Sequence, residues 1–312
     1  MRHRRLGRSG LRVSRTGLGT MTWGSSTSRE DARDQLELFA AAGGNLVDTA
    51  HGYGNGAAEE ILGELLDDVA ARDDLVLCSK AGISRSSGER VVDTSRGTLM
   101  RQLDTSLRRL GTDHLDLWLV HTWSDDAPLE ETLSALEWAV TSGRARYVGV
   151  SNYSGWQAAR ASSLLESARV PLVANQVEYS LLCRIPEDEL VPAAGALGFG
   201  LLAWSPLGRG VLTGKYRHGI PAQSRAASAD FAGFAQRYLD DESAQVVEAV
   251  ATAAQGLGCS AAEVALAWVR DRPGVAAPVL GARTAAQLRT LVGAEDLELP
   301  REIVEALEDV SD

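Results

Sequence analysis

Four polar side chains in the first 121 residues combine the groups needed to pass a proton to or from a carbonyl oxygen: a carboxylate, a phenol, an ammonium and an imidazole. They belong to Asp48, Tyr53, Lys80 and His121. Each stands at, or just past, the end of a short apolar run. If these runs are successive parallel strands, the four side chains gather at the carboxyl ends of the strands, where α/β enzymes hold their chemistry. The sequence therefore predicts an enzyme.

The proton donor predicted by this set is Tyr53, beside Lys80. A free tyrosine has a pKa of about 10, so at neutral pH it is neither a strong acid nor a usable base. An ammonium about 4 Å away stabilises the tyrosinate by roughly 4 kcal/mol at an effective dielectric of about 20, and Asp48 would reduce this effect. We therefore expect the pKa of Tyr53 to fall toward about 7–8, where it can donate to a carbonyl or accept from an alcohol. A neutral His121 would donate a hydrogen bond that orients the substrate oxygen.

The elements that must position these residues alternate along the whole chain, with short apolar runs separated by amphipathic stretches of helical period. The predicted strands are Thr16–Thr20, Leu46–Thr49, Leu75–Lys80, Leu115–Val120, Tyr147–Val150, Val173–Gln176, Gly200–Ala203 and Val275–Val279. The predicted helices are Arg29–Ala41, Ala58–Ala70, Arg96–Leu110, Leu129–Ser142, Gly155–Ser167, Glu187–Leu197, Asp241–Gly256, Ala261–Arg270 and Ala285–Val292. Eight alternations predict an α/β fold with a parallel sheet that closes, a (β/α)8 TIM barrel.

A doubly wound open sheet is the competing architecture. It usually carries GxGxxG after the first strand, and here the third glycine is missing, so the barrel is preferred. Ser28 and Thr94 suit the N-caps of the helices that follow them. Two segments break the repeat. Leu6–Val13 predicts an N-terminal β-hairpin at the bottom of the barrel, and Gly208–Asp240 predicts a long loop after strand seven.

Charge and composition exclude several classes of function. The net charge of −11 argues against general binding to nucleic acid or to an anionic membrane. The three cysteines form no CxxC pair and the five histidines form no HxxxH or HExxH spacing, so neither a disulfide framework nor a metal site is predicted. The N-terminus lacks the apolar segment of a signal peptide, and no apolar run reaches the roughly 18 residues of a membrane span. We therefore expect a cytoplasmic protein with one domain over residues 1–312.

Two further groups of residues suggest ligand binding. The segments Trp204–Gly210 and Gly281–Arg283 follow strands seven and eight. Loops at these positions of a barrel often bind phosphate through backbone N–H groups and a helix dipole, although ordinary glycine-rich turns explain them equally well on their own. Ser151, Asn152 and Gln176 close strands five and six, and together they could hold an amide-bearing ring.

Other patterns fit their motifs poorly. The segment GVSNY lacks the second glycine of a nucleophile elbow, which argues against a hydrolase built on Ser151, His121 and Asp48. The segment GRGVLTGKY fails the P-loop pattern, because Arg209 stands where glycine is needed and Tyr216 where Ser or Thr is needed. Adjacent aspartates suit solvated loops and helix ends better than a glycosidase pair. A nucleotide-independent hydrolase or isomerase is the weakest of the interpretations considered.

Asp48, Tyr53, Lys80 and His121, in this order, resemble the catalytic tetrad of the aldo-keto reductase family. Blocks similar to those of the family span nearly the whole chain: GLGTMTWG, GNLVDTAHGYGNGAAEEILG, SLRRLGTDHLDLWLVH, GRARYVGVSN, ANQVEYS, AWSPLGRGVLTGKY and GARTAAQL. The resemblance implies a barrel that binds NADP(H) over the strand ends and reduces small aldehydes or ketones to alcohols. Tyr53 is then the general acid/base, Lys80 and Asp48 tune it, and His121 orients the carbonyl.

The resemblance also implies which residues contact cofactor and substrate. Those implied at the nicotinamide and its ribose are Thr20, Met21, Asp48, Ser151, Asn152, Gln176 and Trp204. Those implied along the pyrophosphate and the adenosine phosphate are Ser205, Leu207, Gly210, Lys215, Arg225, Gly281, Arg283 and Gln287. Many relatives hold the adenine with Glu and Asn where this chain has Thr290 and Leu291, so the preference for NADP over NAD rests on Arg283, Gln287 and Arg225. Trp23 and Trp123 are expected to border the substrate.

The segment GKYRHGIPAQSR resembles the branch of the family that includes the potassium-channel beta subunits. A cofactor-sensing binding module is therefore the alternative to an enzyme. By the same resemblance, those subunits lack the histidine found here at His121. Its presence favours turnover over sensing.

Overall fold

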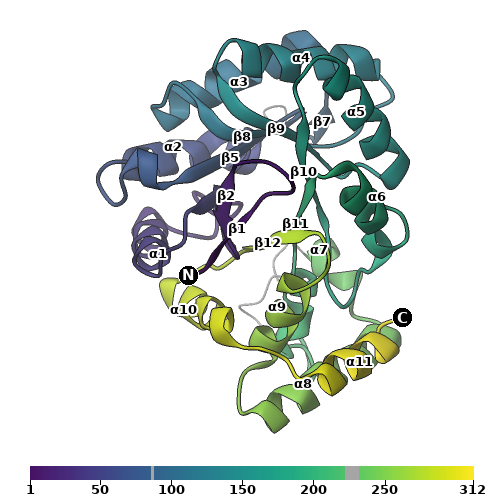
Figure 1. Cartoon of the computed structure of the whole chain (residues 1–312). Coiled ribbons are helices and arrows are strands. Elements are labelled where there is room, and N and C mark those ends of the chain that lie inside the picture. The colour runs from purple at the N-terminus through teal and green to yellow at the C-terminus, as the bar shows by residue number, and fades with distance from the viewer. Residues whose placement is uncertain (86–87, 222–231) are drawn as a thin grey trace.

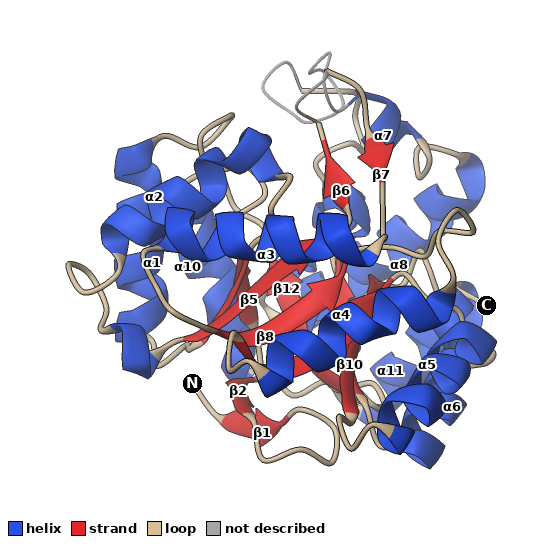
Figure 2. Cartoon of the chain, turned by 90° about the horizontal axis from the view of Figure 1, so that it is seen from above, coloured by secondary structure: helices blue, strands red, loops and turns tan. Residues whose placement is uncertain are grey.

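Eight parallel strands close into a barrel surrounded by helices (Figures 1 and 2), which confirms the predicted fold class. The computed structural model describes residues 1–85, 88–221 and 232–312. Around the barrel the strands follow the order β3, β4, β5, β8, β9, β10, β11 and β12, and β12 pairs with β3 to close the ring. The barrel strands are β3 (Gly17–Gly19), β4 (Leu46–Asp48), β5 (Val76–Ala81), β8 (Leu115–Val120), β9 (Ala145–Ser151), β10 (Leu172–Glu178), β11 (Gly200–Trp204) and β12 (Val275–Leu280).

Helices follow the strands and bury one face against them. They are α1 (Arg29–Ala41), α2 (Ala57–Leu65), α3 (Arg96–Leu110), α4 (Leu129–Thr141), α5 (Gly155–Ser167), α6 (Leu190–Leu197), α7 (Ala232–Gln236), α8 (Asp241–Leu257), α9 (Ala261–Arg270), α10 (Ala285–Gly293) and α11 (Arg301–Val310). Within the described ranges no single helix is long and apolar enough to cross a membrane. The residues of α8 and α9 meet that test only together, as a pair bent by 101°.

Some predicted helix ends are wrong, for local reasons. Helix α2 stops at Leu65, before the predicted Ala70, because Leu66 turns to an extended backbone conformation, with ψ of 140°, and Asp67 after it adopts a left-handed φ of 63°. Helix α6 begins at Leu190, since the preceding residues Ile185–Glu187 form a separate 3-10 turn. The sequence patterns also missed α11.

The two predicted N-caps have different outcomes. Ser28 caps α1, because its hydroxyl accepts a hydrogen bond from the Asp31 N–H at 3.0 Å. Thr94 is not a cap: the N-cap position of α3 is Ser95, which makes no side-chain capping bond. Thr94 instead accepts hydrogen bonds from the Thr132 hydroxyl of α4, so it joins two neighbouring helices.

The predicted N-terminal hairpin is present, and it covers the amino-terminal end of the barrel (Figure 1). Its strands β1 (His3–Arg5) and β2 (Arg12–Ser14) flank a turn whose apolar side chains, together with Val13, are buried with residues at the start of β4 and β5. At Gly7, which has φ of 58°, a Cβ atom would lie 2.3 Å from the Gly198 oxygen. The turn therefore needs glycine in order to approach the chain that enters β11.

Two segments stand at the other end of the barrel, opposite β1 and β2 (Figure 2). One is the described part of the segment after the seventh barrel strand, which contains a 3-10 helix at Gly208–Thr213 and the short α7. The other is a hairpin of β6 (Ile83–Ser84) and β7 (Val91–Val92), which the sequence patterns did not predict.

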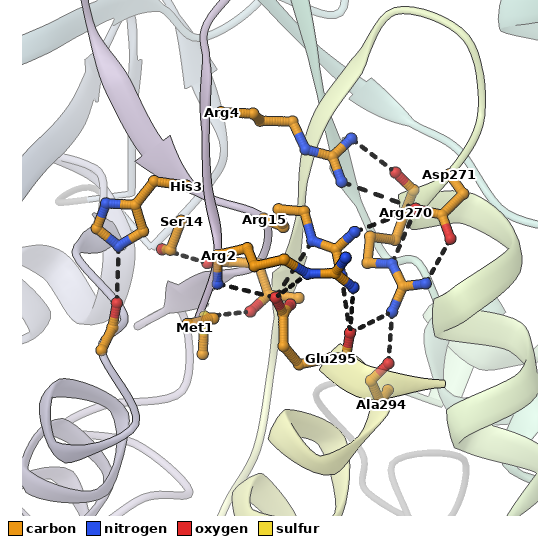
Figure 3. Close-up of polar contacts among 12 residues, drawn as sticks. Met1, Arg2, His3, Arg4, Ser14, Arg15, Arg270, Asp271, Ala294 and Glu295 are labelled. Atoms are coloured by element: carbon orange, nitrogen blue, oxygen red, sulfur yellow. Dashed lines mark hydrogen bonds and ion pairs between the residues drawn. The ribbon is translucent and has the colours of Figure 1, made fainter. Parts of the chain in front are cut away.

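A buried arginine, Arg270 of α9, helps to close the barrel near its seam (Figure 3). Its side chain is 1% exposed and donates hydrogen bonds to the carbonyls of Ala294, Glu295 and Leu297, at 2.5, 3.1 and 2.7 Å. Arg4 of the hairpin donates in turn to the Arg270 carbonyl at 3.1 Å. These contacts join the N-terminal hairpin and α9 to the segment between α10 and α11, and for the Leu297 carbonyl Arg270 supplies the hydrogen-bond donor.

Replacing this guanidinium should therefore destabilise the fold. We expect Arg270→Met to lower the free energy of unfolding by about 1–3 kcal/mol, because buried carbonyls lose a charged donor, while the Asp271 carboxylate is 46% exposed and can be solvated. The matched control is Arg301→Met, where the side chain is 87% exposed and pairs with Glu305 one turn on. It should cost less than about 0.5 kcal/mol. Chemical denaturation followed by circular dichroism measures both, and equal losses would contradict this role of Arg270.

Candidate active site

The four residues singled out first in the sequence lie together at the carboxyl ends of β4, β5 and β8. The Lys80 ammonium donates to Asp48 Oδ2 at 2.7 Å and to the Thr49 carbonyl at 2.9 Å. It lies 3.5 Å from the Tyr53 hydroxyl oxygen. Asp48 is 2% exposed and Lys80 1% exposed, so this is a buried ion pair with a phenol beside it.

Burial and pairing act in opposite directions on the pKa of Lys80. Burial alone would lower it, but the Asp48 carboxylate and then Tyr53 outweigh burial, and the net direction is upward. Lys80 is therefore a permanent cation at neutral pH. A buried ammonium is tolerated here because its partner and two further oxygens replace the water that it loses.

The expected lowering of the pKa of Tyr53 is wrong in direction for this site. Burial of the phenol raises the pKa, Lys80 lowers it, and Asp48 raises it again, with a net shift upward. The physical reason is that Asp48 neutralises most of the charge that Lys80 would offer to a tyrosinate, while desolvation penalises the anion. Tyr53 is thus a neutral phenol at neutral pH, suited to donate a proton.

His121 is neutral and lies edge to face against the Tyr53 ring, with the ring centroids 5.8 Å apart. Burial first, and then the positive charges of Lys80, Arg90 and Arg85, hold its pKa well below the ordinary value. Its Nδ1 atom is buried and has no hydrogen-bond partner among the described residues. An unpaired buried N–H costs more than an unpaired acceptor, so the proton of the neutral ring belongs on Nε2. His121 therefore offers a donor through Nε2.

Gln176 links this set to the opposite side of the barrel. Its Nε2 donates to Asp48 Oδ1 at 2.7 Å, and β10 stands four strands around the ring from β4. With Nε2 held in this way, its Oε1 is an oriented acceptor that has no hydrogen-bond partner within the described part of the chain. A ligand amide N–H is the kind of group that could occupy that acceptor.

Three other predicted nicotinamide-side residues, Ser151, Asn152 and Trp204, form one hydrogen-bonded group. Asn152, which has a left-handed φ of 60°, donates to the His121 carbonyl at 2.9 Å and to Ser151 Oγ at 3.0 Å. Its oxygen accepts the Trp204 indole N–H at 2.9 Å. Thr20 is fully buried and donates to the Asp48 carbonyl, and Met21 beside it is partly buried. The indole of Trp204 is thereby oriented beside the ends of β9 and β10.

The predicted phosphate-side residues lie after β11 and β12, which are neighbouring strands. The loop after β11 contains several left-handed residues, at Ser205, Gly208, Arg209 and Gly210. A Cβ atom on Gly210 would lie 3.0 Å from the Lys215 ammonium. Glycine at this position therefore leaves room for the ammonium beside the backbone. Leu207 closes a turn through its carbonyl, which accepts from Gly210 N at 2.9 Å.

After β12 the exposed Gly281 leads into α10, whose N-cap Thr284 accepts from Gln287 N at 3.3 Å. The Gln287 side chain turns back to accept from Arg283 N at 3.0 Å. A helix N-terminus and two cations, Lys215 and Arg283, are thus found around the ends of neighbouring strands. In a chain of net negative charge, an anion site requires such local positive groups. Arg225 lies outside the described residues.

The two tryptophans expected beside the substrate differ in their exposure. Trp23 is fully buried, and its indole N–H donates to Gln35 Oε1 at 3.1 Å, so it is not at the mouth of the barrel. Trp123 follows β8 and is partly exposed, and its ring meets those of Tyr153 and Trp156 edge to face, with centroids 5.1 and 5.3 Å away. Trp156, which the sequence reading missed, is 57% exposed.

The sequence patterns also did not predict the ion pair of Arg109 and Glu59, which holds the Tyr53 loop in place. Arg109 of α3 donates to the carbonyls of His51 and Asn55 at 3.1 and 3.3 Å, and to the fully buried carboxylate of Glu59 at 3.1 Å. At Gly56, a Cβ atom would lie 2.2 Å from the guanidinium. The sequence offers only a weak signal for this contact. Arg109, the second of two consecutive arginines at the end of α3, falls at the edge of the buried face of the helix.

Comparison with known proteins gives a consistent result over nearly the whole chain. The sequence model of the Aldo/keto reductase family matches residues 15–312. A probable voltage-gated potassium channel subunit beta of Oryza sativa subsp. japonica is 36% identical over 317 residues, which cover 99% of this chain and 96% of that protein. The uncharacterized oxidoreductase YrpG of Bacillus subtilis (strain 168) is 36% identical over 320 residues, with coverage of 99% and 96%. The L-glyceraldehyde 3-phosphate reductase of Escherichia coli (strain K12) is 35% identical over 302 residues, with coverage of 94% and 87%.

The contact of Arg109 with the Tyr53 loop can be tested through His51. Burial first and then the charge of Arg109 lower the pKa of His51 to about 4. Arg109→Met removes the charge and loosens the loop, so the pKa of His51 should rise toward 6.5, by at least about one pH unit. Nuclear magnetic resonance titration of the histidine rings measures this change.

Arg108→Met is the matched control, because Arg108 is exposed on the same helix and its side chain donates to Thr105 one turn earlier. It should leave the pKa of His51 at about 4. The same value in Arg109→Met would show that Arg109 does not act on this loop.

Proposed function

The chain belongs to the aldo/keto reductase family, and we propose that it is an NADP(H)-dependent enzyme that reduces small aldehydes or ketones to alcohols. The observation that carries this proposal is the buried group in which the Lys80 ammonium contacts both the Asp48 carboxylate and the Tyr53 hydroxyl. We further propose that the whole chain, residues 1–312, acts as one catalytic domain in the cytoplasm, where its three free cysteines would stay reduced.

In the proposed reaction a nicotinamide cofactor supplies the hydride that reaches the carbonyl carbon. His121 donates its Nε2 hydrogen bond to the carbonyl oxygen and orients it. Tyr53 gives its hydroxyl proton to the same oxygen, and the alcohol forms. Lys80 stabilises the tyrosinate that remains until the solvent returns a proton, and Asp48 keeps Lys80 charged and in place.

The raised pKa of Tyr53 suits this direction of the reaction. A general acid must hold its proton before the reaction, and a phenol with a raised pKa does so throughout the neutral range. The cost is a less stable tyrosinate, and the Lys80 ammonium at 3.5 Å is placed to offset it at the moment when charge develops. Alcohol oxidation would need the tyrosinate first and should therefore be favoured at alkaline pH.

The residues around the strand ends suit a nicotinamide dinucleotide. Gln176 Oε1 would accept from the carboxamide of the ring, and Trp204 would lie against its face. Ser205, Leu207 and Gly210 would lie along the pyrophosphate, and Lys215 is the cation above that loop. We propose NADP rather than NAD because Arg283 and Gln287 stand at the start of α10, where a further phosphate would be held.

A cofactor-sensing binding module is the second candidate, favoured by the similarity to a protein named as a probable channel subunit beta. The presence of His121 with an oriented donor argues for turnover, because a module that only binds a cofactor needs no donor for a substrate oxygen. Negligible reduction across a broad carbonyl panel, together with a stable membrane partner, would favour the module instead.

The role of Tyr53 gives the direct test of the proposed reaction. Tyr53→Phe removes the proton donor, so kcat for NADPH-dependent aldehyde reduction should fall by about 100-fold or more. Binding of NADPH, followed by quenching of tryptophan fluorescence, should be nearly unchanged.

Tyr147→Phe is the matched control, since Tyr147 packs with the residues at the bottom of the barrel, and it should keep full activity. Full turnover by Tyr53→Phe on every aldehyde that the wild type reduces would refute the assignment of the acid.

A further inference from the structure

The hairpin of β6 and β7 stands directly beside the candidate active site. Strand β6 begins two residues after Ala81, whose carbonyl accepts from the His121 N–H at 2.8 Å. A Cβ atom on Gly52, next to Tyr53, would lie 2.9 Å from the Ile83 oxygen. The hairpin therefore packs against the loop that carries the proposed acid and beside the strand end that carries His121.

Two arginines adjoin the last paired residues of this hairpin. Ile83 pairs with Val92 and Ser84 with Val91, and Arg85 and Arg90 are the next residues on the two sides. Both are exposed, and neither forms an ion pair with a carboxylate in the part of the chain that the structure describes. Glu89, next to Arg90, is the nearest acidic residue in the sequence and is also exposed.

The two arginines concentrate positive charge beside the candidate site. Like charges on neighbouring strand ends repel each other, although the chain as a whole has a net charge of −11. The two charges are also felt inside the site, because both help to lower the pKa of His121. An anion brought between them would relieve their repulsion and find guanidinium groups suited to bidentate binding.

The position of the hairpin separates this pair from the proposed cofactor phosphates. Strand β5, which leads into the hairpin, stands four strands around the ring from β11, directly across the barrel. The cations Lys215 and Arg283 serve the β11 and β12 side. An anion held by the hairpin is therefore on the side of the substrate.

We propose that Arg85 and Arg90 form an anion subsite for the substrate, and that the preferred substrates are aldehydes or ketones that carry a carboxylate or a phosphate. This inference rests on the proposed function. The reacting carbonyl lies at Tyr53 and His121, and the anionic group extends outward to the hairpin. Trp123 follows β8, the strand that ends at His121, and its ring contacts that of Trp156. This aromatic surface accommodates the part of the substrate between the carbonyl and the anionic group.

Pairs of substrates that differ only in charge test the subsite. One arm compares carboxylated benzaldehydes, in ortho, meta and para forms, with the corresponding neutral carboxamides. The other arm compares glycolaldehyde phosphate with glycolaldehyde. For the wild type we expect kcat/KM to favour the anion by about tenfold or more in at least one pair, mainly through KM, with the preference falling as salt is added.

The double variant Arg85→Gln with Arg90→Gln should bring that preference close to one, while kcat/KM for the neutral partners stays within about twofold of the wild type. The control Arg301→Gln removes an exposed arginine from α11 and should keep the preference intact.

Each other outcome has a definite meaning. Normal reduction of the neutral aldehydes without a preference for anions, or a preference that survives in the double variant, would overturn the subsite and leave the proposed reductase standing. No NADPH-dependent reduction of any compound, charged or neutral, would overturn the proposed function and this inference with it.

Discussion

A buried ion pair, Lys80 with Asp48, is the interaction on which the rest of the site depends. An ammonium that is 1% exposed would lose its proton unless a carboxylate and further oxygens replaced its water, and Asp48, Thr49 and Tyr53 supply them. Asp48 uses its second oxygen to accept from Gln176 across the barrel. One carboxylate thus keeps the cation charged, positions the phenol and links opposite strands of the barrel.

The need to hold this buried ion pair distinguishes the two ends of the barrel. The amino-terminal end of the barrel is sealed by the β1–β2 hairpin and by Arg270, both of which act on stability. The carboxyl-terminal end holds side chains that are both buried and polar. Residues outside the barrel strands are therefore needed to keep them in position. Arg109 and Glu59 give that support to the Tyr53 loop, and the β6–β7 hairpin brings two further cations to the same edge.

Much of this could be predicted from the sequence, because hydrophobic period and strand-end polar residues are local signals. The bounds of α1, α3, α5 and α9 are those predicted, and the tetrad residues meet as expected. Three features could not be predicted. The contacts of Arg109 and Arg270 depend on elements far apart in the sequence, and α2 ends where the backbone of Leu66 becomes extended and that of Asp67 left-handed. The direction of the pKa of Tyr53 depends on burial, which composition does not measure.

Tyr53 is a neutral acid held by a charged lysine, and a spectroscopic titration of its phenol can establish this state. The difference in tyrosinate absorbance between the wild type and Tyr53→Phe, followed from neutral to alkaline pH, reports the ionisation of this one phenol. We expect the tyrosinate of Tyr53 to form only above the ordinary pKa of 10.0. A tyrosinate already present near neutral pH would contradict this expectation and would show that Lys80 lowers the pKa of Tyr53, as the sequence alone suggested.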